Sequence, residues 1–478
     1  MKITFIDPPN LLEKKNVERV FGCGYSPYPI PNIFSLTNAA VLERAGFEVV
    51  FIDAANERWG REKCKKFLVI DSSDMYVFHS VNLSQQPDLY ILDLIRGKHR
   101  NVYAAFTGPA PTLFASAFLR DEHTFVIRGE SEETLRALAC ALKEGRDYKD
   151  IAGLSFFSQG QCVDNPPRAL VEDLDSIPFP ARHLAKRDIY HNPKLPRNPF
   201  TVMQTSRNCP YRCIFCVPNS YSFSRELEYR RYHEDKKPPL RMRSAGNVIA
   251  EFRALRAEGY RSVSVIDDQF LWDEPRTVQI CEGIKALGIE WGCLARADCL
   301  TDTAARHLRQ AGLQYIDLGV ESFSQKILND VNKDISVERI YEAVAILKKN
   351  RILVKINLLL GASPLQSAAS IREDIRKAKE LDVDAVMFSV ATPFPGTPFY
   401  RRAQENRWLL NGHYVPHNVQ SRSIIQYPSL SAQEMETMIR RANLSFYFSP
   451  RFLFKNCMRM LNPRNAWYGL VALKRKIL

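Results

Sequence analysis

Residues 205–217 read T-S-R-N-C-P-Y-R-C-I-F-C-V and hold Cys209, Cys213 and Cys216 in a C-x3-C-x2-C pattern. Three thiolates this close can hold one metal centre, but they are one short of the four ligands of a closed zinc site or a fully ligated 4Fe–4S cluster. A cluster that reacts with a substrate or cofactor needs one coordination position free of protein ligands, so the stretch predicts a reactive iron–sulfur cluster. Two alternatives are a zinc site completed by a distant histidine such as His233, and three unrelated buried thiols.

The chain around this stretch, over residues 200–400, alternates apolar strands with amphipathic helices. Six units are fewer than the eight of a closed α/β barrel, so we expect a partial, open (β/α)6 barrel. The expected strands are Phe200–Gln204, Ser262–Ile266, Glu290–Leu294, Tyr315–Gly319, Leu353–Leu360 and Ala385–Val390.

Polar residues cluster just after these strands, at the barrel rim that usually carries the reactive groups. The cysteines follow the first strand, and Asn357 lies within the fifth. The others are Asp267, Asp268, Arg296, Asp298, Glu321 and Ser322.

Residues 1–150 also alternate strands and helices, which predicts a Rossmann-like, doubly wound parallel sheet. None of its loops is a G-x-G-x-x-G phosphate loop, which disfavours a plain dinucleotide domain. We interpret 151–199 as a proline-rich connector, 200–405 as the barrel and 406–478 as a mostly helical tail.

Composition fits a soluble α/β protein of 478 residues with a net charge of +13. The N-terminus enters a strand directly, and the eight scattered cysteines do not resemble a disulfide framework, so we expect a cytoplasmic protein. From Arg440 onward, basic and aromatic residues interleave and acids are absent. This tail either contacts an anionic membrane surface or caps the barrel. The mixed-sign run 225–243 is interpreted as a solvated excursion.

The cysteine motif C-x3-C-x-F-C, with G-V-E-S at 319–322 and P-F-P-G-T-P at 393–398, resembles the radical S-adenosylmethionine (SAM) superfamily. With the N-terminal α/β domain, it resembles the subclass with a cobalamin-binding domain, typified by the anaerobic magnesium-protoporphyrin ester cyclase and the hopanoid methylases. The resemblance implies that Cys209, Cys213 and Cys216 bind three irons of a 4Fe–4S cluster and that SAM chelates the fourth.

The resemblance also implies cofactor-binding residues. Those implied for SAM are Phe215, Asp268, Arg296, Glu321, Ser322 and Asn357. Those implied for cobalamin are Pro9, Gly108 and Gly129. The D-x-H-x-x-G string that supplies a cobalt ligand in many relatives is missing. T-G-P-A-P at 107–111 stands where G-G-P-H-P is frequent, and R-G-E-S at 128–131 stands where R-G-E-G is common.

These expectations describe a cobalamin-assisted radical SAM enzyme that transfers a methyl group, or cyclises or rearranges its substrate. The substrate is expected to be a bulky, apolar small molecule or lipid, and a flavodoxin or ferredoxin is expected to donate electrons; no nucleic acid is expected. One alternative is a radical methylthiotransferase acting on RNA, with further cluster ligands at Cys23, Cys64 and Cys140. Another is a zinc-containing protein that binds nucleic acid or a membrane surface.

Overall fold

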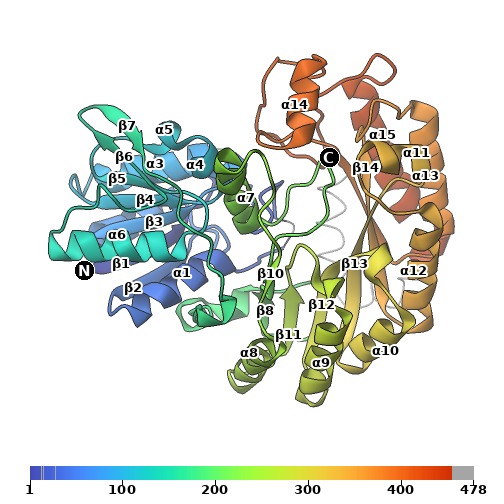
Figure 1. Ribbon diagram of the computed structural model, residues 1–478, viewed down its shortest axis with the longest axis horizontal. Helices are drawn as coiled ribbons and strands as arrows, with labels where there is room; N and C mark the ends of the chain where they lie inside the picture. The colour runs from blue at the N-terminus through green and yellow to red at the C-terminus, as the bar shows by residue number, and fades with distance from the viewer. Residues whose placement is uncertain (12, 14, 27, 455–478) are drawn as a thin grey trace. The chain divides into compact units, whose positions relative to one another are not determined.

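The computed structural model describes residues 1–11, 13, 15–26 and 28–454. The chain forms two compact units (Figure 1). The first unit contains Met1–Tyr190 and Pro218–Arg243, and the second contains His191–Val217 and the chain from Ser244 onward. The expected connector at 151–199 is therefore divided, because residues up to Tyr190 pack with the first unit.

The first unit is built on a seven-stranded sheet in the order β2-β1-β3-β4-β5-β6-β7. The first five strands are parallel, and the hairpin β6–β7 adds to β5 in antiparallel fashion. The predicted parallel α/β arrangement is confirmed here. The strands are β1 (Lys2–Asp7), β2 (Glu48–Asp53), β3 (Met75–His79), β4 (Tyr103–Thr107), β5 (Thr124–Ile127), β6 (Leu154–Ser158) and β7 (Gln161–Asp164).

Helices cover both faces of this sheet, as the two separate hydrophobic cores require (Figure 1). Helices α1 and α6 pack in one core, and α2 to α5 contribute to the other. The helices are α1 (Ile33–Arg44), α2 (Arg61–Ile70), α3 (Gln85–Arg96), α4 (Pro109–Leu113), α5 (Ala115–Phe118) and α6 (Glu132–Glu144).

A seventh helix of this unit, α7 (Ser220–Tyr232), corrects the sequence interpretation of the run 225–243. Residues Ser220–Glu228 are all buried, including Arg225 and Glu228. The interpretation as a solvated excursion was wrong, because the charged side chains of α7 have buried partners far away in the sequence. The short strand β10 (Arg241–Met242) follows α7.

The second unit is built on a parallel six-stranded sheet whose spatial order follows the chain, β15-β14-β13-β12-β11-β8. All six predicted strands are present; the third and fourth run on to include Arg296 and Glu321. The strands are β8 (Phe200–Met203), β11 (Ser262–Val265), β12 (Glu290–Arg296), β13 (Leu313–Glu321), β14 (Leu353–Leu360) and β15 (Ala385–Val390), with a short β9 (Ser206–Arg207) after β8.

One face of this sheet packs against helices in a single large core (Figure 1). Side chains alternate along each strand, so residues such as Val354 and Ile356 enter the core while Lys355 and Asn357 face the other side. The helices are α8 (Ala245–Ala257), α9 (Glu274–Ile284), α10 (Asp302–Gln310), α11 (Gln325–Asp330), α12 (Val337–Lys349), α13 (Ala368–Glu380), α14 (Pro398–Glu405) and α15 (Ala432–Tyr447).

The described part of the tail packs as a cap on this core. Met435, Ile439 and Phe446 of α15 are buried, while Arg440 and Arg441 are exposed. The basic residues beyond Phe454 lie outside the described residues. Within the described chain, no helix combines the length and the apolar character needed to span a membrane.

Candidate active site

The cysteine loop is held in place by Asp267, which follows β11 and is fully buried. Its carboxylate accepts hydrogen bonds from the Thr205 amide at 2.5 Å and from the Thr205 and Ser206 hydroxyls at 2.5 and 2.8 Å. Arg276 donates to the Thr205 carbonyl at 3.1 Å. Of the two adjacent aspartates in I-D-D-Q-F, Asp267 therefore anchors the loop.

Two backbone hydrogen bonds fix the loop further along. The Ile214 amide donates to the Val331 carbonyl, and the Phe399 amide donates to the Ile214 carbonyl, both at 3.1 Å. Cys213 is buried, whereas Cys209 and Cys216 are half-buried. Phe215, predicted at the SAM site, packs against the core of the second unit.

The metal-ligand geometry bears on the zinc alternative. Among the described residues, no group of three or more His, Cys, Asp or Glu side chains is arranged to hold a single metal ion. A zinc site needs ligands that converge on one point. The three thiolates of a 4Fe–4S site each bind a different iron and need no such convergence.

Arg296 at the end of β12, two strands away from β8 in the sheet, reaches the cysteine loop. Its guanidinium stacks 3.5 Å from the ring centroid of Tyr211, and its Nη1 lies 3.6 Å from the Cys213 sulfur. The same side chain donates to both oxygens of Asp298 at 3.0 Å and to the Lys333 carbonyl at 2.6 Å. The guanidinium therefore places a fixed positive charge beside the central thiol.

A second ion pair lies next to this group, at the end of β13. Lys333 donates to Glu321 Oε1 at 2.9 Å, and both side chains are buried. Glu321 has a φ of +69°, at the point where the pairing of β13 with β14 shifts register. A Cβ added to Gly319 would lie 2.9 Å from both Lys333 Nζ and Glu321 Oε1, so the glycine makes room for this pair. Sequence analysis assigned no role to Lys333, which follows a helix, or to Tyr211, which lies between two of the cysteines.

Asn357 is paired with Gly319 across the sheet and lies on the face that the helices leave open. Within the described chain, its buried Oδ1 has no hydrogen-bond partner. The buried Ser389 hydroxyl of β15 has none there either, and Ser389 is paired with Leu359, two residues beyond Asn357. Buried polar atoms are rarely left unsatisfied, so these two fit a polar ligand such as SAM.

The other predicted SAM residues are placed differently. Ser322 is fully buried and donates to Asp374 of α13 at 2.8 Å, while Asp374 also accepts from the Phe323 amide at 2.7 Å. Ser322 thus connects a strand end to a helix. Asp268 is half-buried, next to the anchoring Asp267.

A Lys–Asp–Lys cluster lies two residues below Gly319 and Asn357 on the same face. Asp317 binds Lys194 at 2.8 Å and Lys355 at 2.9 Å, and Lys194 also lies 3.7 Å from the ring centroid of Tyr315. Burial lowers the pKa of both lysines, against the attraction of Asp317. Burial disfavours the Asp317 carboxylate as well, but the two ammonium groups outweigh this and hold its pKa below its usual range.

The residues implied for cobalamin, Pro9, Gly108 and Gly129, follow β1, β4 and β5 of the first unit. A Cβ at Gly129 would lie 3.2 Å from the Glu228 Cβ of α7. A Cβ at Gly108 would lie 2.5 Å from the Ser80 carbonyl oxygen. Both glycines are in close contact with the chain itself, so in this structure these residues do not fit a bound corrin ring.

The cysteines considered for a second cluster lie in separate surroundings. Cys64 of α2 packs with Ala54 and Trp59, whereas Cys140 of α6 packs against a different core. Cys23 is half-buried, and its thiol donates to the Phe21 carbonyl. This arrangement does not support the methylthiotransferase alternative.

Comparison with known proteins agrees with this geometry. The family model for the radical SAM superfamily matches residues 203–363. An uncharacterized methyltransferase of Pyrococcus horikoshii is 27% identical, over 95% of this chain and 94% of its own. The anaerobic magnesium-protoporphyrin IX monomethyl ester cyclase of Synechocystis is 24% identical, over 85% of this chain and 78% of its own.

Among solved structures, the cobalamin-dependent SAM radical enzyme OxsB, with aqua-cobalamin and SAM bound, superposes with a TM-score of 0.72. The identity is 17%, over 98% of this chain and 72% of OxsB, so this likeness concerns the fold. The match at 203–363 contains the cysteine loop and the strand ends described above. Residues 203–363 are therefore a radical SAM domain.

Proposed function

We propose that Cys209, Cys213 and Cys216 hold a 4Fe–4S cluster and that the enzyme starts radical chemistry on an unactivated carbon of a bulky, apolar small molecule. The observation that carries this proposal is the anchored cysteine loop with Arg296 beside Cys213. When bound, the cluster supplies the electron that cleaves SAM into methionine and a 5′-deoxyadenosyl radical. The protein supplies position and exclusion of water.

The sheet face around Asn357 is the proposed SAM site. The unsatisfied Asn357 Oδ1 would accept a hydrogen bond from a donor group of SAM, and Ser389 would offer its hydroxyl. Asp268 is the proposed partner of the SAM amino group, Glu321 of the ribose and Arg296 of the carboxylate. We infer that the sequentially ordered sheet is a partial (β/α)6 barrel and that the first unit is Rossmann-like, with the strand order 2-1-3-4-5 of many doubly wound domains.

Two reaction types follow from the named relatives. The Pyrococcus protein is named a methyltransferase and the Synechocystis protein a cyclase. Both types begin with the same cleavage of SAM and need a reductant, for which we propose a flavodoxin or ferredoxin. We also propose a cytoplasmic enzyme whose basic tail contacts the membrane surface.

The test is anaerobic reconstitution with iron and sulfide, followed by reduction in the presence of SAM. We expect about four irons per chain and formation of 5′-deoxyadenosine and methionine. Cys213→Ala should lose both the cluster absorption and the cleavage of SAM. Cys162→Ala removes an exposed cysteine of β7 and should leave both unchanged. Equal SAM cleavage by Cys213→Ala and wild type would refute the proposal.

A further inference from the structure

Helix α7 is an unusual helix because its buried surface is polar. Its first nine residues, Ser220–Glu228, are all buried, and they include three serines, Arg225 and two glutamates. Buried polar groups destabilise a fold unless each one is hydrogen-bonded or paired. The position of α7 can therefore be read from the partners of these side chains.

These partners lie at the carboxyl ends of three parallel strands of the first sheet. After β3, His79 Nε2 lies 2.8 Å from the Ser220 hydroxyl. After β4, the Thr112 hydroxyl lies 2.7 Å from that of Ser224. After β5, the Gly129 carbonyl accepts from the Ser224 hydroxyl at 3.2 Å.

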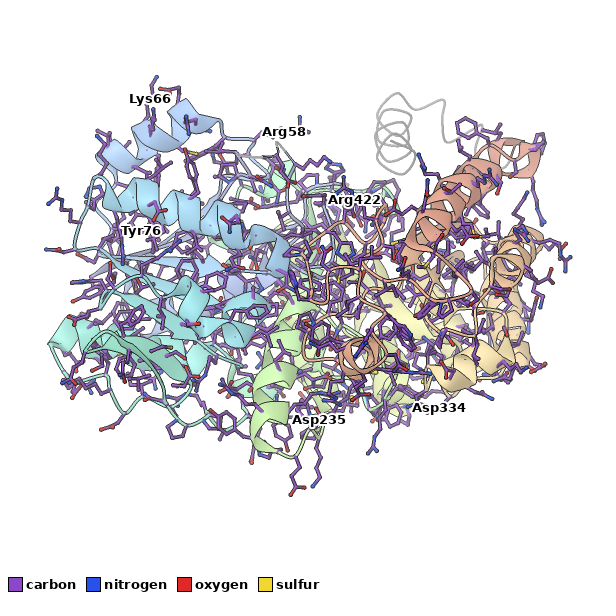
Figure 2. The ribbon with its side chains drawn as sticks, turned by 90° about the horizontal axis from the view of Figure 1, so that it is seen from above. Arg58, Lys66, Tyr76, Asp235, Asp334 and Arg422 are labelled. Carbon is purple, nitrogen blue, oxygen red and sulfur yellow. The ribbon has the colours of Figure 1, made fainter. Side chains whose placement is uncertain are left out.

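Charged pairs reinforce the same contact. Arg225 binds Glu130 at 3.0 Å, and Arg128 binds Glu228 at 3.1 Å, with all four side chains buried. The Tyr221 hydroxyl accepts from the Ser131 amide at 3.1 Å. At its other end α7 reaches the exposed turn that carries Asp235, labelled in Figure 2.

The remaining part of this edge is covered by the segment between β1 and α1. The Ser220 amide donates to the Val20 carbonyl at 2.7 Å, and Arg19 binds Asp88 through both guanidinium nitrogens. A cavity lined by Asp7, Arg19 and neighbouring residues has a volume of about 20 Å³. A space of this size holds about one water molecule.

This edge is where parallel α/β sheets bind their ligands, outside the carboxyl ends of the strands. A corrin would have to lie against Gly108 and Gly129, and α7 with its own contacts occupies that position. His79, the histidine that ends β3, uses both ring nitrogens within the protein, on Ser220 and Thr107. Replacing α7 by a corrin would remove Glu228 and Arg225, the ion-pair partners that Arg128 and Glu130 have on this helix.

We propose that α7 takes the place of the corrin on the first sheet and that this enzyme starts its radical chemistry without bound cobalamin. The statement about radical chemistry rests on the proposed function, whereas the statement that α7 covers the sheet edge rests on the packing of α7 alone. It separates this chain from OxsB, whose structure holds aqua-cobalamin. A consequence is that a methyl group cannot reach the substrate from methylcobalamin in this enzyme.

The test uses the full chain, reconstituted anaerobically and incubated with hydroxocobalamin before gel filtration. We expect about four irons per chain with no retained cobalt and no corrin absorption. Hydrogen exchange of the peptide 220–232 should be slow and unchanged by hydroxocobalamin. Equimolar cobalt, or faster exchange of 220–232 when hydroxocobalamin is added, would overturn the inference.

A variant and a control keep the two proposals distinct. Glu228→Ala opens the space beside Gly129, and its measured gain of corrin absorption over wild type would support α7 as the barrier. If Glu228→Ala stays folded by circular dichroism and wild type alone retains cobalt, the inference fails.

Cys213→Ala is the control for the proposed function, and its cobalt content should match that of wild type. If the reconstituted wild type does not cleave SAM and also retains no cobalt, the proposed function is refuted, but the role of α7 is not.

Discussion

Asn357 is a residue whose buried amide oxygen indicates a missing partner. Its Oδ1 is buried and unsatisfied within the described chain, while the same strand buries Ile356 and Leu358 in the core on the opposite face. Asn357→Leu replaces the amide by an apolar group of similar size, so stability should change little or improve. If SAM is the partner, the KM for SAM should rise about tenfold or more, as expected for a lost hydrogen bond to a charged ligand.

The measurement is 5′-deoxyadenosine formation as a function of SAM concentration, together with the thermal midpoint. Asn443→Leu is the matched control, because Asn443 is also buried with an unsatisfied Oδ1 but lies on α15. An unchanged KM for Asn357→Leu would remove Asn357 from the SAM site.

Asp374 gives a second prediction for a single residue, on how the stability of the protein depends on pH. Burial raises its pKa to about 6, although the Phe323 amide and the Ser322 hydroxyl favour the carboxylate. The folded state therefore binds this proton more tightly than the unfolded state, whose aspartates titrate near pH 4. Between about pH 4 and 6 the contribution of Asp374 to stability should fall as pH rises, by up to about 3 kcal/mol. The free energy of unfolding, measured in denaturant at several pH values, should depend less on pH for Asp374→Asn than for wild type. Parallel pH dependences would contradict the raised pKa of Asp374.

At the scale of elements, the pairing of β13 with β14 depends on a buried charge cluster. Asp317→Asn leaves Lys194 and Lys355 buried without their counter-charge, and removal of one partner of such a pair costs about 3–5 kcal/mol. We expect the midpoint of chemical unfolding to fall accordingly. Combining Asp317→Asn with Lys355→Met should restore part of the loss, because one uncompensated charge is removed. A change below about 0.5 kcal/mol for Asp317→Asn would show that solvent already screens the cluster.

The elements that sequence analysis could find are those that bury apolar side chains. The strands Leu353–Leu360 and Ala385–Val390 were predicted with their observed bounds, because nearly continuous runs of apolar residues mark them. The ends of β12 and β13 were missed, since Arg296 and Glu321 continue the strands with polar side chains toward the open face. Helix α7 could not be found this way, because its partners Arg128 and Glu130 lie about a hundred residues earlier.

The candidate site, like the elements, was predictable only where a local sequence pattern marks it. The cysteine motif, Asp267 and Asp268, and the polar strand ends all follow a local pattern. No local pattern assigned roles to Lys333, Tyr211 and Ser389, because their partners or their lack of one become visible only in the folded chain.

At the scale of the whole molecule, the first unit is assembled from two separate stretches of chain. A fragment of residues 1–190 lacks α7 and so loses the ion pairs that Arg128 and Glu130 make with Glu228 and Arg225. We expect it to bind a hydrophobic dye and to unfold with low cooperativity. The same fragment fused through a flexible linker to residues 218–243 should unfold cooperatively, as measured by circular dichroism in denaturant. Equal cooperativity of the two fragments would show that α7 contributes little to this unit.

The division of the chain also sets an order of events during synthesis. The ribosome produces the cysteine loop after Tyr190 and before α7, which completes the first unit. The first unit therefore stays unfinished while the loop emerges, and its polar edge closes only when Ser220–Tyr232 has followed. A nascent chain stalled between Val217 and Arg243 would thus already contain the three cysteines while the carboxyl edge of the first sheet is still uncovered.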